Sequence, residues 1–237
     1  MFFQQLQQAF RHRFTEDQQS LVEKLSDFLF HQPETKVFII DGYAGTGKTG
    51  LMSALVKVLP FYSIKTILLA PTGRAAKVLS RNSQKTASTI HKHIYYSSID
   101  ANGNISLKLK NNKSTSTLYI VDEASMIGAR EQGFEAHNLL DDLLQHCLSG
   151  YGNKIIFMGD TAQLPPIGSA TSPALNQEYI ETEFILNAQY QRLTQVVRQA
   201  LQSGILRNAS NIRWAIANAR IRLPILKTKD LNDVRIV

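Results

Sequence analysis

The feature that most constrains this chain is a glycine-rich loop, GYAGTGKT, at residues 42–49. It directly follows KVFIID (36–41), an apolar run with the length of a buried strand, and it precedes a segment that we expect to be helical up to Pro60. Glycines allow backbone N–H groups to turn inward around phosphates, and a helix N-terminus adds partial positive charge. This context predicts a phosphate-binding loop made of Gly42, Ala44, Gly45, Thr46, Gly47, Lys48, Thr49 and Gly50.

Two side chains of this loop are expected to contact the phosphates or their metal ion. Lys48 is placed to reach β- and γ-phosphates, and Thr49 is placed to ligand Mg²⁺. The alternative is a glycine turn followed by a chance Lys-Thr pair, which the strand and helix on either side disfavour.

Apolar runs alternate with helical patterns along the rest of the chain. The predicted strands are 65–70, 117–124 and 154–160, and the predicted helices are 15–31, 72–80, 88–96 and 138–148. Uninterrupted apolar strands that alternate with helices indicate an α/β fold with a parallel sheet covered on both faces. The polar segment 97–116 differs, because Asn102-Gly103 lies between two short alternating runs. It predicts a small β-hairpin inserted between a helix and a strand.

The composition of the chain limits the classes of molecule that it is expected to bind. Lys and Arg outnumber Asp and Glu by 26 to 19, and the formal net charge is +7, which favours a polyanionic partner and nucleic acid ahead of a membrane surface. The single cysteine, Cys147, excludes an internal disulfide. The N-terminal segment is interrupted by Gln too often for a signal peptide, and no apolar run approaches the length of a membrane span. We therefore expect a cytoplasmic protein without a membrane partner.

Polar residues follow two further strands, and a carboxylate next to Asp122 favours hydrolysis over transfer to a small acceptor. Asp122, at the end of a predicted strand, is placed to hold Mg²⁺ through water, and the adjacent Glu123 is placed to orient and deprotonate an attacking water. Asp160 ends the next strand, and Gln163 lies just beyond it. Gln163 either senses a γ-phosphate or belongs to a polar turn stiffened by the following Pro-Pro pair; the residues alone leave both readings open.

Seven sequence blocks carry a resemblance to a known family. They are FTEDQ (14–18), GYAGTGKT (42–49), APTGRAAKVL (70–79), TIHKHIY (89–95), IVDEASMI (120–127), GDTAQLPPIG (159–168) and LTQVVRQ (193–199). In this order and spacing they resemble the first RecA-like motor domain of a superfamily 1 DNA helicase of the RecD-like group, exodeoxyribonuclease V alpha-subunit-like, which translocates 5′ to 3′. The resemblance implies a RecA-like P-loop NTPase.

The resemblance implies further roles at the nucleotide. Gln18 resembles the glutamine that hydrogen-bonds the adenine edge, which makes ATP the expected nucleotide, bound with Mg²⁺. Gln163 resembles the γ-phosphate sensor, and Arg198 resembles an arginine that contacts the γ-phosphate at the domain cleft. The alternatives are a solvated glutamine at a helix start and a surface arginine.

A second set of residues is expected to contact DNA. Thr72 and the Gly73 backbone can donate to a DNA phosphate at a helix N-terminus, and Thr89 and His91 resemble a second strand-contacting block. The basic hairpin either holds DNA or is a solvated loop. The predicted DNA-binding residues are Pro71, Thr72, Gly73, Arg74, Thr89, His91, Lys108 and Lys110, with Lys113 nearby.

The predicted organisation is a motor domain at 1–200, followed at 201–237 by a helical or extended lead-in to a second motor domain, whose motifs we do not find after residue 200. The expected function is that of the ATP-binding motor of a DNA helicase, acting on single-stranded DNA or a single/double-strand junction in recombination or repair. We expect these residues alone to hydrolyse ATP negligibly. The alternatives are a P-loop small-molecule kinase and an ATP-gated nucleic-acid-binding module without turnover. DNA-stimulated ATPase activity separates these functions.

Overall fold

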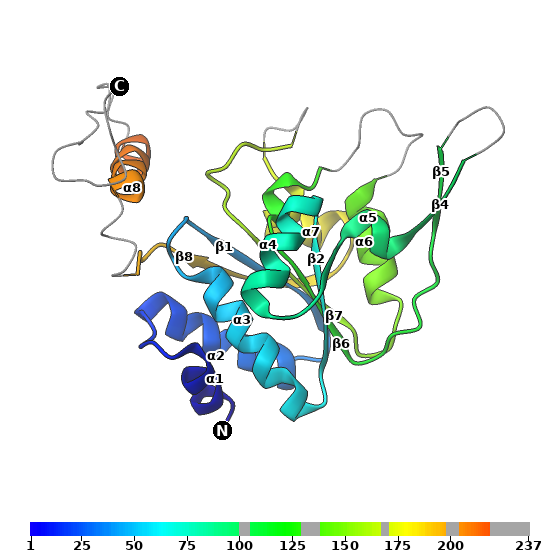
Figure 1. Cartoon of the computed structure of the whole chain (residues 1–237), viewed down its shortest axis with the longest axis horizontal. Coiled ribbons are helices and arrows are strands. Elements are labelled where there is room, and N and C mark those ends of the chain that lie inside the picture. Colours follow the sequence, from blue (N-terminus) through cyan, green and yellow to red (C-terminus); the bar gives the residue numbers. More distant parts are fainter. Residues whose placement is uncertain (100–104, 129–137, 167–170, 198–203, 219–237) are drawn as a thin grey trace.

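A six-stranded, all-parallel sheet organises the molecule. The computed structural model describes residues 1–99, 105–128, 138–166, 171–197 and 204–218. The strand order is β3-β2-β6-β7-β1-β8, so β1 lies between β7 and β8 (Figure 1). The strands are β1 (Thr35–Gly42), β2 (Lys65–Ala70), β3 (Ala87–Thr89), β6 (Thr117–Val121), β7 (Lys154–Gly159) and β8 (Asn187–Leu193).

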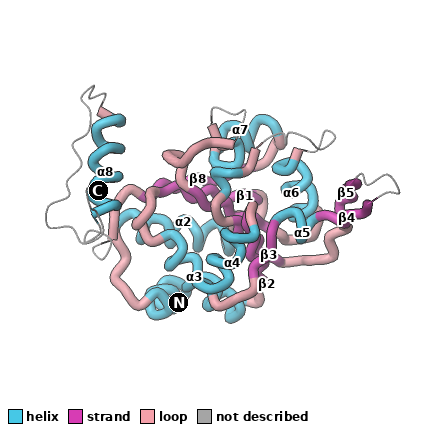
Figure 2. The backbone as a smooth tube through the Cα atoms, turned by 45° about the horizontal axis from the view of Figure 1, so that its top comes forward, coloured by secondary structure: helices cyan, strands magenta, loops and turns pink. Residues whose placement is uncertain are grey.

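Helices cover both faces of the sheet, as the strand pattern predicts (Figure 2). One core contains residues of α1 (Phe2–Phe10), α2 (Glu16–Phe30), α3 (Lys48–Val58) and α4 (Gly73–Ser83). The other contains residues of α5 (Ile90–Ile94), α6 (Leu139–Leu148) and α7 (Gln177–Glu183). The remaining described helices are α8 (Gly204–Ala217) and the short η1 (Leu59–Tyr62), η2 (Ala124–Met126) and η3 (Pro173–Leu175).

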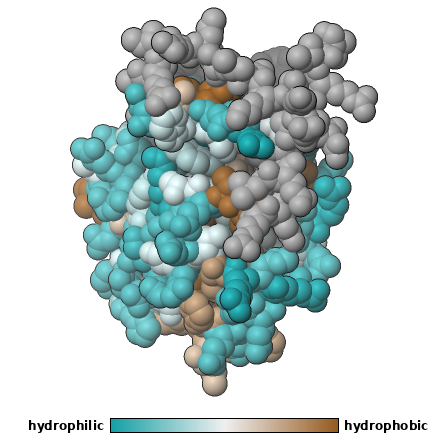
Figure 3. All heavy atoms as spheres, turned by 90° about the vertical axis from the view of Figure 1, so that its left-hand side faces the viewer, coloured by the Kyte–Doolittle hydropathy of each residue, from teal (hydrophilic) through white to brown (hydrophobic). Residues whose placement is uncertain are grey.

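The period of two along β1 explains the two cores. Phe38 and Ile40 pack into the first core, whereas Val37 and Ile39 pack into the second, and all four are fully buried. Figure 3 shows that hydrophilic side chains cover most of the described part of one outer face. Within the described residues, no helix has the length and apolar character needed to cross a membrane.

The inserted hairpin is confirmed as an antiparallel pair. β4 (Tyr95–Ile99) pairs with β5 (Ile105–Leu109), and the predicted Asn-Gly turn lies outside the described residues. The pair stands away from the main sheet (Figure 1).

Two predicted boundaries are wrong. The helix expected at 88–96 is interrupted, because residues 87–89 pair with β2 as an edge strand and residues 95 and 96 belong to β4. The strand expected at 117–124 ends at Val121, because Glu123 adopts a left-handed conformation with φ of 54°.

His93 is expected to make the fold less stable as the pH falls from about 6.5 towards 4. The pKa of His93 is lowered to about 4, chiefly by burial and also by the charges of His146, whose ring centroid lies 5.4 Å away, and of Lys110. Between these pH values the unfolded chain binds a proton that the folded protein excludes, so stability is lost as the pH falls through this window. Urea unfolding at about pH 7.5 and about pH 5 measures the difference.

The variant His93→Gln should lose less stability over the same interval, and His12→Gln, which changes an exposed histidine, should behave like the wild type. Equal losses in the wild type and in His93→Gln would assign the pH dependence to other groups.

Candidate functional site

The glycine loop joins the carboxyl end of β1 to the N-terminus of α3, as predicted. Gly45 and Gly47 have φ of 82° and 83°, a conformation that glycine adopts without steric cost. A Cβ atom at Gly47 would lie 2.6 Å from Gln18 Nε2, and one at Gly42 would lie 2.9 Å from Leu193 Cβ. The turn and the close packing around it therefore require glycine at these positions.

The loop borders a cavity of about 320 Å³ at the carboxyl edge of the sheet. This edge is where ligands bind in open α/β folds. The lining residues come from three separate strand ends and from the segment after β8. They are Tyr43, Ala44, Gly45, Gly47, Lys48, Thr49, Gly50, Asp122, Glu123, Gly159, Asp160, Gln163 and Val197. The fold thus brings together the predicted loop, the two predicted acids and Gln163.

Lys48 places a half-buried ammonium group in this site. Its Nζ donates hydrogen bonds to the backbone oxygens of Gly42 and, at 3.1 Å, of Tyr43. Burial lowers the pKa of Lys48, while the carboxylates of Asp160 and Asp122 oppose the shift and favour the charged form. A cation held among carboxylates beside a glycine loop is suited to bind a phosphate chain.

Asp122 and Glu123 occupy the turn after β6. The Glu123 amide donates to Asp122 Oδ1 at 3.0 Å, and Glu123 itself has φ of 54°, a conformation that costs a non-glycine residue about 1–2 kcal/mol. The pKa of Asp122 is raised to about 6, chiefly by burial; the hydrogen bond from the Glu123 N–H lowers it, and the negative charge of the Glu123 side chain raises it. A cation would relieve the cost of that buried carboxylate, and oxygen ligands such as Asp122 and the Thr49 hydroxyl suit Mg²⁺.

Gln163 lies on the exposed loop after β7. Its backbone N–H donates to Asp160 O at 3.0 Å, and its side-chain oxygen accepts a hydrogen bond from Ser125 Oγ at 3.4 Å. Ser125 lies in η2, which begins directly after Glu123, so this contact joins the loop after β7 to the turn that contains Asp122 and Glu123.

Gln18 lies beneath the glycine loop rather than on the cavity wall. The side chain is 1% exposed; its Oε1 accepts from Thr15 N at 3.1 Å, and its Nε2 donates to Thr46 O at 2.8 Å. Thr15 caps α2 in return, which forms a capping box. In this arrangement Gln18 supports the loop, and its contact with an adenine edge stays a prediction. Arg198 lies outside the described residues.

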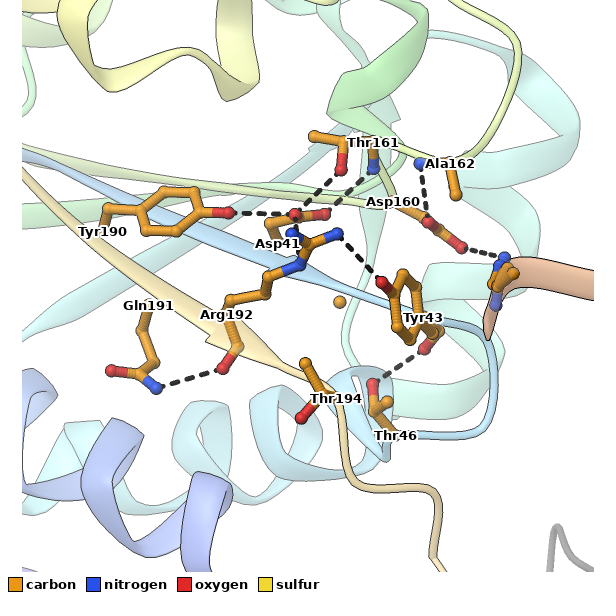
Figure 4. A network of polar contacts seen from close by, with 12 residues as sticks. Asp41, Tyr43, Thr46, Asp160, Thr161, Ala162, Tyr190, Gln191, Arg192 and Thr194 are labelled. Carbon is orange, nitrogen blue, oxygen red and sulfur yellow. Dashed lines mark hydrogen bonds and ion pairs between the residues drawn. The ribbon is translucent and has the colours of Figure 1, made fainter. Parts of the chain in front are cut away.

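A polar network beside the loop was missed by the sequence analysis (Figure 4). Asp41, at the end of β1 and 1% exposed, accepts hydrogen bonds at 2.9 Å from Thr161 N, Thr161 Oγ1 and Tyr190 Oη. Arg192 Nε lies 3.4 Å from the same carboxylate. Asp41 therefore ties together the carboxyl-side residues of β1, β7 and β8. The one available signal was a charged residue at the end of an apolar run.

Tyr43, a residue of the glycine loop, also contacts this network. Arg192 donates to the Tyr43 hydroxyl at 3.0 Å. The guanidinium of Arg213, on α8, lies 4.5 Å from the centre of the Tyr43 ring and forms a 2.7 Å ion pair with the buried Asp160. α8 is thus attached to two residues of the cavity wall, a link that no sequence pattern indicated.

The residues predicted to contact DNA lie at the ends of neighbouring strands. Thr72 caps α4 by accepting from Ala75 N at 3.2 Å, and Thr89 caps α5 by accepting from Lys92 N at 3.3 Å. β2 and β3 are paired, with Ala70 opposite Thr89. The N-termini of α4 and α5, which follow these two strands, therefore lie at the carboxyl edge of the same sheet. Pro71, Gly73 and the exposed Arg74 belong to the same segment as Thr72.

The remaining residues of that set differ in their exposure. The half-buried His91 ring lies 5.7 Å from the ring of Tyr95. Lys110 Nζ donates to Lys92 O at 2.6 Å and lies 5.2 Å from the centre of the Tyr96 ring, whereas Lys108 is exposed. Lys110 thus ties the hairpin to α5, and Lys108 faces solvent.

Comparisons with known proteins show what this chain resembles as a whole. The AAA domain family matches residues 13–222. The ATP-dependent RecD2 DNA helicase of Deinococcus radiodurans is 28% identical over 204 residues, which cover 85% of this chain and 24% of the relative. The ATP-dependent DNA helicase dda of Enterobacteria phage T4 is 34% identical over 167 residues, which cover 67% of this chain and 34% of the relative. The chain therefore spans about a quarter to a third of these relatives.

A solved structure supports the fold. The Pif1 helicase from Candida albicans superposes with a TM-score of 0.52 at 17% identity, covering 85% of this chain and 44% of that one. The similarity confirms the RecA-like α/β architecture around the site.

Proposed function

The chain belongs to the AAA domain family, in which it is a RecD-like superfamily 1 helicase motor domain. We propose that it binds ATP with Mg²⁺ and uses hydrolysis to act on DNA. The observation that carries the proposal is the convergence of Lys48, Asp122, Glu123 and Gln163 on one cavity beside the glycine loop. The proposal includes 5′ to 3′ movement on single-stranded DNA or at a junction, in recombination or repair.

Three residues of the cavity wall, Lys48, Glu123 and Gln163, have roles in the proposed reaction. Lys48 binds the β- and γ-phosphates, because its ammonium lies at the loop and the nearby carboxylates favour its charged form. Glu123 accepts the proton of the attacking water. Gln163, which contacts the turn of Glu123 through Ser125, reports the γ-phosphate to the 161–166 loop.

Thr49 and Asp122 would hold Mg²⁺, which supplies charge neutralisation to the phosphate oxygens when bound. Arg198 would contribute further positive charge from the segment after β8, a role that rests on the resemblance alone. Removing a finger arginine typically costs about 10³- to 10⁵-fold in rate. Hydrolysis at this site is therefore expected to depend on charges beyond the residues of the cavity wall.

ATP turnover stimulated by single-stranded DNA tests the proposal in the full-length protein. Stimulation by DNA, with no requirement for a small phosphate acceptor, is the expected result. Transfer of the γ-phosphate to a mononucleotide or another small acceptor would instead favour a P-loop kinase.

The basic hairpin is expected to contribute salt-dependent DNA affinity. Replacing Lys108, Lys110 and Lys113 together with alanine should weaken binding of single-stranded DNA. Each lost phosphate contact should reduce the slope of log K against log salt by about 0.7, because fewer counterions are released. Fluorescence anisotropy with a labelled oligonucleotide, across a salt series, measures both quantities.

A charge-matched control is available away from the hairpin. Lys24, Lys57 and Lys65 are exposed on α2, α3 and the start of β2. Replacing these three should leave the slope unchanged. If the hairpin variant and this control have the same slope as the wild type, the hairpin is a solvated loop.

A further inference from the structure

The segment that follows β8 crosses the glycine loop. We call residues 194–197 the strap. The Tyr43 N–H donates to Leu193 O at 3.4 Å just before the strap, and the Val197 N–H donates to Gly45 O at 3.0 Å at its end. Val197 also lines the cavity. The strap therefore forms part of the cavity wall and is bonded to the backbone of the loop.

The Asp17 carboxylate holds the strap from the other side, and the Glu16 carboxylate accepts a longer hydrogen bond, at 3.4 Å, from Gln195 Nε2. Asp17 Oδ2, in the first turn of α2, accepts hydrogen bonds from Thr194 N at 2.7 Å, Thr194 Oγ1 at 2.9 Å and Gln195 N at 3.0 Å. The Asp17 N–H donates in return to Gln195 Oε1 at 3.2 Å. Burial alone would raise the pKa of Asp17, but the hydrogen bonds from Thr194 and Gln195 outweigh it, so the pKa is lowered. The contacts are thus made to the charged form.

We propose that Asp17 is a positioning residue for nucleotide binding, because it holds the strap against the glycine loop. The inference rests on the proposed function and adds to it a residue that lies outside the cavity wall. The strap binds the carbonyl oxygen of Gly45, which would repel a phosphate group if it faced the cavity unpaired. It also places Val197 beside the loop, where a Cβ atom at Gly47 would lie 3.5 Å from the Val197 side chain.

Hydrogen bonds to a charged group explain why a carboxylate is needed here. Such bonds are roughly twice as strong as neutral ones. In Asp17→Asn the side chain keeps its shape, yet all three bonds from the strap lose their charged acceptor. The strap should then separate from the loop more often, and the nucleotide would have to restore the contact when it binds.

The competing explanation is that Asp17 only stabilises α2. An acidic residue in the first turn of a helix interacts favourably with the helix dipole. That role predicts a loss of stability in Asp17→Asn but no specific loss of nucleotide affinity. Asp141 is an exposed first-turn acid of α6, so Asp141→Asn is a matched control for the helix effect.

Titration of the whole 237-residue chain with fluorescent ADP and ATP analogues, in the presence of Mg²⁺, tests the inference. Asp17→Asn should raise Kd by about tenfold, which corresponds to the loss of a charge-assisted hydrogen bond. Asp141→Asn should leave Kd unchanged. Chemical unfolding of the same samples separates affinity from stability.

The Thr194 hydroxyl provides a second, milder test. Thr194→Val removes one of the three donors and should raise Kd, whereas Thr194→Ser keeps the donor and should restore wild-type affinity. The effects of Asp17→Asn and Thr194→Val should be less than additive, since both act on one contact.

Two results would overturn the inference in different ways. If Asp17→Asn lowers stability and leaves Kd at the wild-type value, Asp17 is a helix-capping acid and the proposed function stands. If the wild-type chain binds neither nucleotide, the proposed function fails, and the role of Asp17 fails with it.

Discussion

Replacing Lys48 with alanine is expected to weaken binding of Mg-ATP by at least about a hundredfold. Hydrogen bonds to charged groups contribute about 1.5–3 kcal/mol each, and each 1.4 kcal/mol is about tenfold in affinity. The variant also removes the cation that faces Asp122 and Asp160, so these two carboxylates would repel the incoming phosphates without compensation. Titration of the chain with a fluorescent ATP analogue measures the loss.

Lys57→Ala provides the control, because Lys57 is an exposed lysine in the last turn of the same helix. It should bind nucleotide like the wild type. Lys48→Arg should recover only part of the affinity, since a planar guanidinium does not fit the space of an ammonium that contacts two loop carbonyls. Wild-type affinity in Lys48→Ala would contradict the assignment of the phosphate site.

The glycine loop and the central strands could be predicted because their determinants are local. Gly45 and Gly47 have φ of 82° and 83°, which glycine adopts without steric cost, so the pattern of the loop follows from the backbone geometry of the turn itself. β1 is buried on both faces, and its uninterrupted apolar run directly reflects that burial. The convergence of Asp122, Glu123 and Gln163 then follows from the parallel sheet, which places their strand ends at one edge.

β8 escaped prediction because it is an edge strand. It pairs only with β1 among the described strands, and its sequence, NAQYQRL, is largely polar. Such a strand buries fewer side chains and lacks the apolar run that identifies central strands. Its absence from the prediction also concealed Tyr190 and Arg192, which extend from it towards Asp41.

The contacts of Asp41, Tyr43 and Asp17 lay beyond sequence reasoning for a different reason. Each joins side chains that are more than a hundred residues apart, such as Asp41 with Tyr190 and Asp17 with Thr194. No local pattern encodes the partner of a buried carboxylate. Gln18 was identified from the sequence as a site residue, but its hydrogen bond to Thr46 O became visible only in the structure.

Replacing Glu123 with glutamine is expected to reduce ATP hydrolysis by about 10²- to 10⁴-fold while leaving nucleotide binding intact. The amide cannot accept a proton from water, yet Lys48, Thr49 and Asp122 retain their positions around the cavity. Steady-state turnover of the full-length protein with single-stranded DNA measures the rate. Titration of the same variant with the fluorescent ATP analogue measures the affinity.

Comparing substitutions at Asp122 and Glu123 tests which of the two residues is the general base and which is the metal ligand. Asp122→Asn should weaken binding of the nucleotide in the presence of Mg²⁺, whereas Glu123→Gln should not, if Asp122 holds the metal and Glu123 receives the proton. Glutamine keeps the left-handed backbone at position 123 as strained as glutamate does, so unfolding of Glu123→Gln should match the wild type. A joint loss of binding and turnover in Glu123→Gln would make Glu123 a ligand of the metal and place the base elsewhere in the cavity.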